Sequence, residues 1–284
     1  MLTTSELKRL LRAHDLRLTK RLGQHHLVEA RVIARIADAC QLSRRDTVVE
    51  IGAGLGALTE PLAARAGRVI AVEVDKRICA LLSRRMSAWR NVSVICQDIL
   101  DFAWAPMNGS FVVGAIPYHV TSPIFLSLCE HREVIRAAML IVQEEVAQRL
   151  AAAPSTKAYG RLTVFAQYCW EVSVLFRVPR SAFFPQPEVD SCCVQLIARS
   201  RPVVAVKNEG RLFELVKAAF SHRRKTLVNC LTGQDGLGMH RAEAEELVAQ
   251  LRLPRSVRGE TLSLDQFAAL ANALTHTNSL RDKK

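Results

Sequence analysis

A hydrophobic run leads directly into a glycine-rich turn near residue 50, and this feature constrains the possible fold more than any other. The run covers residues 47–51, and glycines then alternate at Gly52, Gly54 and Gly56 before a helix-like segment at 57–62. Glycine lets the backbone turn sharply and lets a ligand approach the chain without meeting a Cβ. The pattern predicts a strand, a turn and a helix belonging to a parallel sheet.

Acidic residues lie at or just after the ends of the next two predicted strands. A strand over 68–74 contains Glu73 near its end, and a strand over 91–97 is followed by Asp98. A carboxylate in the position of Glu73 can accept hydrogen bonds from the two hydroxyls of a ribose. Asp98 could meet the amino group of an adenine, or it could simply cap a turn or helix. Together these residues indicate a nucleoside site at the carboxyl ends of neighbouring parallel strands.

The glycine spacing favours one class of nucleoside cofactor. Dinucleotide sites typically read G-x-G-x-x-G, with the wider spacing beside a pyrophosphate. Here the spacing is G-x-G-x-G, preceded by Glu50. This form resembles the first motif of S-adenosylmethionine-dependent methyltransferases, although taken alone it leaves a dinucleotide site or a mere turn open.

The remaining pattern predicts an α/β fold followed by helices. Helical stretches such as 76–86 and 123–130 separate the first five strands, which is the rhythm of a parallel sheet. The last two strands have no helix between them, so we expect them to pair antiparallel. We therefore predict a seven-stranded, mostly parallel Rossmann-like sheet of the class I methyltransferase type at 1–200 and a small all-α domain at 201–284. The other predicted strands are 111–116, 137–143, 171–178 and 191–198, and the C-terminal helices are 212–220, 242–251 and 264–274.

The net charge of +12 favours an anionic partner. Either basic cluster alone could be an ordinary solvated face, but two clusters beside such a sheet favour phosphate contacts. We therefore predict nucleic-acid binding. The first cluster contains Lys8, Arg9, Arg12, Arg17, Lys20 and Arg21, and the second contains His222, Arg223, Arg224 and Lys225.

Other classes of protein fit the sequence less well. No apolar run approaches the about 20 residues that span a bilayer, and the N-terminus lacks a secretory signal. The eight cysteines are scattered without a C-x-x-C pair, which predicts reduced core residues and no metal site. We expect a cytoplasmic monomer that makes no membrane contact.

The fourth predicted strand ends in Gly114-Ala115-Ile116-Pro117-Tyr118, which bears on the chemistry. The amino nitrogen of a nucleobase is a weak nucleophile because its lone pair is delocalised into the ring. A side-chain carbonyl and a backbone carbonyl at a proline can accept both N–H hydrogens and aim the lone pair at a methyl donor. An aromatic ring such as Tyr118 can stack on the base once the base has left its helix. A proline–aromatic pair is also common in ordinary turns. The functional interpretation therefore depends on the position of this pair at the end of a strand of the sheet.

In these motifs the chain resembles the small-subunit ribosomal RNA adenine N6,N6-dimethyltransferase family. Members of this family dimethylate two adjacent adenines near the 3′ end of that RNA. The resemblance covers about residues 17 to 270, and its late motifs fit this group better than the similar macrolide-resistance methyltransferases of large-subunit rRNA. The matching segments are 22–27, 50–56, Glu73, Asp98, 114–118, 159–162, 183–191 and 220–227.

The resemblance implies a cofactor, a substrate and roles for individual residues. S-adenosylmethionine would be contacted by the cofactor set His25, Leu27, Gly52, Gly54, Glu73, Asp98 and position 115. The catalytic set would be position 115, Pro117, Tyr118 and Phe183, with the target base between the two aromatic rings. The partners would be small-subunit rRNA and the small ribosomal subunit, docked by Lys20, Arg21, Arg223, Arg224 and Lys225.

One departure from the family pattern affects catalysis. The family reads N-[LI]-P-Y where this chain has Ala115, and alanine offers no carbonyl to the target amino group. Loss of one such preorganised contact typically costs about 10²–10³ in rate. Either the asparagine has been deliberately replaced or this is a natural member with weakened catalysis, and the otherwise complete motif set favours the first. A lesser departure is His26, where the family has Phe, at the lip of the predicted cofactor pocket.

Two classes of function stay open on the sequence. The first is an enzyme that methylates adenine N6 in small-subunit rRNA, with activity impaired by Ala115. The second is a non-catalytic assembly factor that binds immature small subunits.

Overall fold

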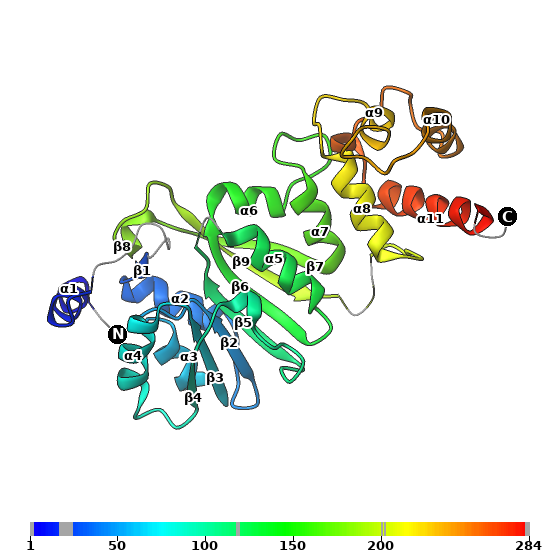
Figure 1. Cartoon of the computed structure of the whole chain (residues 1–284). Helices are drawn as coiled ribbons and strands as arrows, with labels where there is room; N and C mark the ends of the chain where they lie inside the picture. Colours follow the sequence, from blue (N-terminus) through cyan, green and yellow to red (C-terminus); the bar gives the residue numbers. More distant parts are fainter. Residues whose placement is uncertain (1–2, 17–24, 118–119, 200, 202, 282–284) are drawn as a thin grey trace. The chain divides into compact units, whose positions relative to one another are not determined.

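The structure, a computed structural model, describes residues 3–16, 25–117, 120–199, 201 and 203–281 (Figure 1). The chain divides into two compact units. The first comprises residues 1–147 and 171–198, and the second comprises 148–170 and 199–284.

The first unit is built on a seven-stranded sheet with the order β4-β3-β2-β5-β6-β9-β7. Strands β2 to β6 pair in parallel, whereas β9 runs antiparallel to β6. This confirms the predicted seven-stranded, mostly parallel sheet. Its strands are β2 (Thr47–Ile51), β3 (Arg68–Glu73), β4 (Val92–Cys96), β5 (Ser110–Ala115), β6 (Ile135–Gln143), β7 (Trp170–Val178) and β9 (Ser191–Ala198).

Apolar side chains cover both faces of this sheet. Val48, Val69 and Val113 point to one face, where they pack with α2 (Ala30–Ala39) and α3 (Thr59–Arg65) in one buried cluster. Successive residues of a strand point to opposite faces, so Ile51 and Val72 point to the other. They line a cavity there with Ile124 of α5 (Thr121–Glu130). The two-sided burial explains why the strands read as nearly continuous apolar runs.

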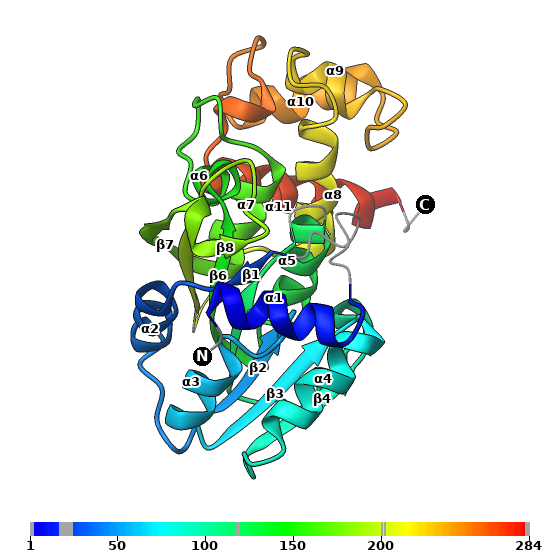
Figure 2. The same cartoon turned by 90° about the vertical axis from the view of Figure 1, so that its left-hand side faces the viewer.

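A basic N-terminal helix, α1 (Thr4–Ala13), packs beside α4 (Lys76–Met86) (Figure 2). It begins with a capping box formed by Thr3 and Glu6. Its buried face, Leu7 and Leu11, packs against Leu55 and against α4. A two-stranded ribbon adjoins it, in which β1 (His26–Leu27) pairs antiparallel with β8 (Phe183–Phe184). Short 3-10 turns complete the unit at Ile99–Asp101 and Arg180–Ala182.

The second unit is helical. Helix α7 (Arg161–Cys169) packs on α8 (Glu209–Ala219), with the rings of Phe165 and Phe213 4.7 Å apart and edge to face. The division of the chain at residue 200 stays a prediction about domains, but residues 148–170 pack with these helices. The other elements of the unit are α9 (Leu227–Leu231), α10 (Arg241–Gln250), a 3-10 turn at Gly259–Thr261 and α11 (Leu264–Arg281). Helix α6 (Glu144–Leu150) crosses from the first unit into the second.

Element boundaries differ from the predictions mainly at the ends of the chain's later elements. The predicted strand 47–51 and helix 76–86 match β2 and α4 to the residue. The last helix was predicted to end at Leu274 but continues to Arg281, because polar residues can extend a helix once an apolar turn has anchored it. Every cysteine except Cys96 is buried. Across the described part of the chain, no helix is long and apolar enough to cross a membrane.

Candidate active site

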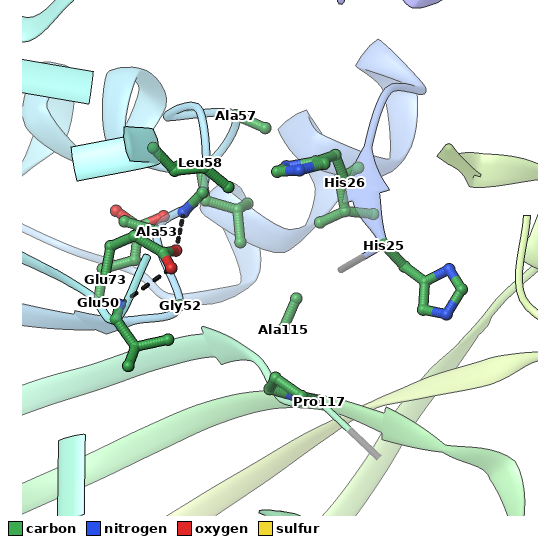
Figure 3. Close-up of a pocket in the computed structure, with 14 residues that line it drawn as sticks. His25, His26, Glu50, Gly52, Ala53, Ala57, Leu58, Glu73, Ala115 and Pro117 are labelled. Atoms are coloured by element: carbon green, nitrogen blue, oxygen red, sulfur yellow. Dashed lines mark hydrogen bonds between the residues drawn. The ribbon is translucent and has the colours of Figure 1, made fainter. Parts of the chain in front are cut away.

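A cavity opens at the carboxyl ends of β2, β3 and β5, where the sequence predicted a nucleoside site (Figure 3). Its wall combines the glycine turn, the β1 strand and the end of β5. It brings most of the predicted cofactor residues together in one place. The lining residues are His25, His26, Leu27, Glu50, Gly52, Ala53, Gly54, Ala57, Leu58, Glu73, Val74, Ile78, Ala115 and Pro117.

Glu73 is fixed at the end of β3 by backbone amides. One carboxylate oxygen accepts a hydrogen bond from the N–H of Gly54 at 2.9 Å, and the other accepts from Val74 at 2.9 Å and Asp75 at 3.0 Å. Burial raises the pKa of Glu73, while these three N–H groups act in the opposite direction. The carboxylate therefore ties the glycine turn to β3 and keeps a fixed orientation at the cavity.

Glu50 is a second buried acid in the same wall. It is 2% exposed, and its carboxylate accepts a 2.6 Å hydrogen bond from the hydroxyl of Thr59. Burial raises the pKa of Glu50 to about 8; the Thr59 bond opposes this, and the nearby charge of Glu73 adds to it. A cation beside Glu50 would favour its ionised form, so this wall suits a positively charged ligand.

The chain turns sharply at the glycines, as the sequence predicted. Gly52, Gly54 and Gly56 have φ values of 65°, 56° and 85°, which side chains rarely adopt. A second cavity shares Gly52, Val74 and Pro117 with the first one. It is lined mainly by apolar side chains, with Gln97 and Asp98 among them. Asp98 also caps the following 3-10 turn by accepting from the N–H of Leu100 at 3.0 Å, so both roles considered for it are compatible.

The β1 strand and the residue before it supply three consecutive residues to the cavity. Leu27 is buried against the core of the unit. The Nδ1 atom of His25 lies 2.7 Å from the carbonyl oxygen of Pro185, and its ring points away from the two carboxylates (Figure 3). The ring of His26 instead points into the cavity (Figure 3). His26 thus forms part of the wall itself, rather than only the lip that the sequence predicted.

The predicted catalytic residues are only partly assembled. The methyl group of Ala115 points into the cavity, and Pro117 lies beside it (Figure 3). Tyr118 lies outside the described residues. Phe183 is 6% exposed, packs in the same core cluster as Leu27, and is not part of either cavity wall. Its backbone pairs with Leu27, so in this structure it anchors β1 and offers no open ring face; its stacking role stays a prediction.

The basic residues of the second cluster differ in their surroundings. Arg223 donates to the carboxylate of Glu260 at 2.6 Å and to the backbone carbonyls of Lys157 and Thr156 at 2.7 Å and 3.1 Å. It therefore has a structural contact within its own unit. Arg224 and Lys225 are exposed, and in the described part of the chain no hydrogen bond or ion pair engages their side chains. Lys20 and Arg21 lie outside the described residues.

The sequence profile described as "Ribosomal RNA adenine dimethylase" matches residues 16–275. The chain belongs to this family. It is 40% identical to the ribosomal RNA small subunit methyltransferase A of Geobacillus kaustophilus, with 96% of each chain covered. It is also 40% identical to the protein of the same name from Enterococcus faecalis, covering 96% of this chain and 95% of that protein.

Solved structures with the same architecture include two methyltransferases. A dimethyladenosine transferase from Plasmodium falciparum is 26% identical, with a TM-score of 0.74 over 90% of this chain and 98% of that chain. The 23S rRNA methyltransferase ErmE is 29% identical, with a TM-score of 0.65 over 88% and 99%. These comparisons confirm the class I methyltransferase fold and the family that the motifs predicted.

Two polar residues of the cavity wall were not included in the predicted binding set. Glu50 was noted only as the residue before the glycines, and His26 only as a departure from the family pattern. An acid within an otherwise apolar strand is itself a signal of a functional site, because strands covered on both faces rarely hold a charged side chain without a partner. His26 gave no comparable local signal, since its place in the wall depends on β1 pairing with β8.

The raised pKa of Glu50 predicts a pH-dependent stability. Because the folded chain holds this proton up to about pH 8 and the unfolded chain releases it near 4.5, stability from this group falls as pH rises between those values. Between pH 6.5 and 8 the free energy of unfolding should fall by up to about 1.4 kcal/mol per pH unit. Glu50→Gln, which is always neutral, should flatten this slope in urea unfolding series. Parallel slopes for the two proteins would contradict the assignment.

Proposed function

We propose that this chain is an S-adenosylmethionine-dependent methyltransferase that dimethylates N6 of adenines in small-subunit rRNA. The observation that carries the proposal is the acidic wall of the cofactor cavity. Of the described residues in its wall, two are carboxylic acids, Glu50 and Glu73, and none is Lys or Arg. Such a wall suits a cofactor with a positive sulfonium and ammonium group, and it disfavours a pyrophosphate.

The two adjoining cavities match the parts of this cofactor. Glu73, held by backbone amides, is positioned to accept hydrogen bonds from ribose hydroxyls. The second cavity has apolar walls from Ile51, Val72 and Ile124, which suit the faces of an adenine ring. Asp98 at its side can accept from the adenine amino group. The residues present therefore fit S-adenosylmethionine.

The chemistry requires only positioning from the protein. S-adenosylmethionine, when bound, supplies an electrophilic methyl group. The end of β5 then orients the target base, because Ala115 and Pro117 border the cavity at that point. The carbonyl of Pro117 accepts hydrogen bonds from Val120 N–H and the Thr121 hydroxyl, each at 3.2 Å, which ties Pro117 to the start of α5. Without a carboxamide at position 115, we expect weakened methyl transfer.

An rRNA substrate is supported by the names of the relatives and by two basic surfaces. The exposed face of α1 carries Lys8, Arg9 and Arg12, which border an open groove. This helix also packs on Ile78, a residue of the cofactor cavity wall. In the second unit, Arg224 and Lys225 offer exposed cations. Both surfaces suit phosphate contacts, whose strength should fall with added salt.

The direct test is transfer of labelled methyl groups from S-adenosylmethionine to small ribosomal subunits that lack the adenine methylations. We expect slow transfer to adenine N6 in these subunits and none to fully methylated small subunits. Salt-sensitive subunit binding without any transfer would favour the alternative, a non-catalytic assembly factor, which the alanine at position 115 keeps under consideration.

We expect the basic residues of the second unit to have two different roles, a structural role for Arg223 and RNA binding for Arg224 and Lys225. Arg223→Ala removes the ion pair with Glu260 and two hydrogen bonds to backbone carbonyls. We expect it to lower the free energy of unfolding by about 1–2 kcal/mol in thermal or urea melts, after allowance for solvent exposure.

The matched variant Arg224→Ala/Lys225→Ala should leave stability within about 0.5 kcal/mol. It should instead weaken subunit binding and reduce the slope of log affinity against log salt by roughly 1 to 2. An unchanged salt slope would indicate that Arg224 and Lys225 are ordinary solvated charges that do not contact the RNA.

A further inference from the structure

His26 contains a buried polar atom without a protein partner. Across the described residues its Nε2 atom is buried and has no hydrogen-bond partner. A buried donor or acceptor left unsatisfied normally costs about 1–3 kcal/mol, so such an atom calls for an explanation. The ring lines the cofactor cavity, which means that a ligand bound there is the natural candidate for the missing partner.

The ring is held in place by the fold. His26 pairs with Phe184 across the β1–β8 ribbon, which sets the direction of its side chain. A Cβ placed on Gly54 would lie only 2.8 Å from Nδ1 of His26. The imidazole therefore rests directly on the glycine turn, and the absence of a side chain at Gly54 makes room for it.

The chemistry of the other walls determines what His26 can recognise. Figure 3 shows Glu50 and Glu73 across the cavity from His26. Glu73, and Glu50 once a nearby cation favours its ionised form, attract the ammonium and sulfonium groups of S-adenosylmethionine and repel its carboxylate. That carboxylate needs a hydrogen-bond donor away from the two acids, and the His26 ring is a side chain of the opposite wall that can donate.

A histidine is better suited to this place than a lysine or arginine. Burial lowers the pKa of His26 to about 4, and the neighbouring His25 lowers it too. The ring is thus neutral at physiological pH and donates through one N–H without adding a positive charge beside the sulfonium. Ala115, whose methyl group points into the same cavity, has no polar atom to offer (Figure 3).

We infer that His26 is a positioning and specificity residue of the cofactor site, donating from Nε2 to the carboxylate of the amino-acid end of S-adenosylmethionine. This inference rests on the proposed function. It assigns a role to a residue at which this chain departs from the family pattern. The consequence is a site that distinguishes cofactors with the carboxylate from those without it.

The test compares two ligands that differ only in this group, S-adenosylmethionine and decarboxylated S-adenosylmethionine. Affinities for the full chain are measured by calorimetry for the wild type, His26→Phe and His26→Gln. We expect His26→Phe to lower the preference for the carboxylated ligand by about tenfold, the size expected for a lost hydrogen bond to a charged group. His26→Gln, which keeps a donor, should retain most of the preference.

A purely structural role for His26 makes a different prediction. Phenylalanine removes the unsatisfied nitrogen, so the ligand-free His26→Phe protein should melt at the same temperature as the wild type or higher, while its preference for the carboxylated ligand falls. A structural role would lower both the melting temperature and the affinities for both ligands. His14→Phe, at an exposed histidine of the same unit, serves as the control.

The outcomes separate this inference from the proposed function. Equal losses for the two ligands in His26→Phe, or no loss for either, would overturn the role of His26 while leaving the cofactor assignment in place. A wild type that binds neither ligand would overturn the proposed function, and the inference with it.

Discussion

Replacing Ala115 with Asn is expected to raise the rate of methyl transfer to small ribosomal subunits by about 10²–10³. The side chain of residue 115 points into the cavity at the end of β5 (Figure 3), so a carboxamide there can accept a hydrogen bond from the target amino group. That contact aims the nitrogen lone pair at the methyl donor and is made most strongly in the transition state. The rate should therefore rise much more than the affinity for the cofactor.

The measurement is transfer of labelled methyl groups under single-turnover conditions, together with cofactor affinity by calorimetry. Ala115→Leu is the matched control, because it adds bulk at the same position without a carbonyl. Similar rates for the Asn and Leu variants would contradict the acceptor role. Equal activity of Ala115→Asn and the unchanged chain would mean that this member methylates by other contacts, and that Ala115 is no impairment.

Replacing Glu73 with Ala is expected to weaken cofactor binding by about 10² or more. The variant loses the acceptor for the ribose hydroxyls, and hydrogen bonds to a charged group are worth about 1.5–3 kcal/mol each. It also releases the N–H groups of Gly54, Val74 and Asp75 from their shared acceptor. The glycine turn would then lose its tie to β3, so a decrease in stability should accompany the loss of affinity.

Binding of S-adenosylhomocysteine, measured by calorimetry well below the melting temperature of the variant, tests this expectation. Asp101→Ala is a suitable control, because Asp101 is an exposed acid near the same edge of the sheet and is not part of either cavity wall. Affinity for Glu73→Ala within a few fold of the wild type would remove Glu73 from the cofactor site.

The sequence by itself determined the secondary structure of the sheet and the place of the site. The apolar run before the glycines predicted β2 to the residue, and apolar residues at helical spacing predicted α4 to the residue. This was possible because strand and helix periodicities are local properties of the chain. The alternating glycines predicted a sharp turn after β2, and the acids at the end of β3 and just after β4 marked the same edge of the sheet. The motifs also predicted the family that the comparisons confirmed.

Only the tertiary structure decided which side chains make contacts within the protein and which face a cavity or the solvent. Arg223 looks like its neighbours in sequence, yet it pairs with Glu260, 37 positions away. Phe183 was predicted to face the target base, but the pairing of β8 with β1 buries it. His26 enters the cavity wall through the same pairing. These contacts join segments far apart in the chain, and no local pattern of hydrophobicity or charge specifies such a pairing, because it depends on how whole elements pack.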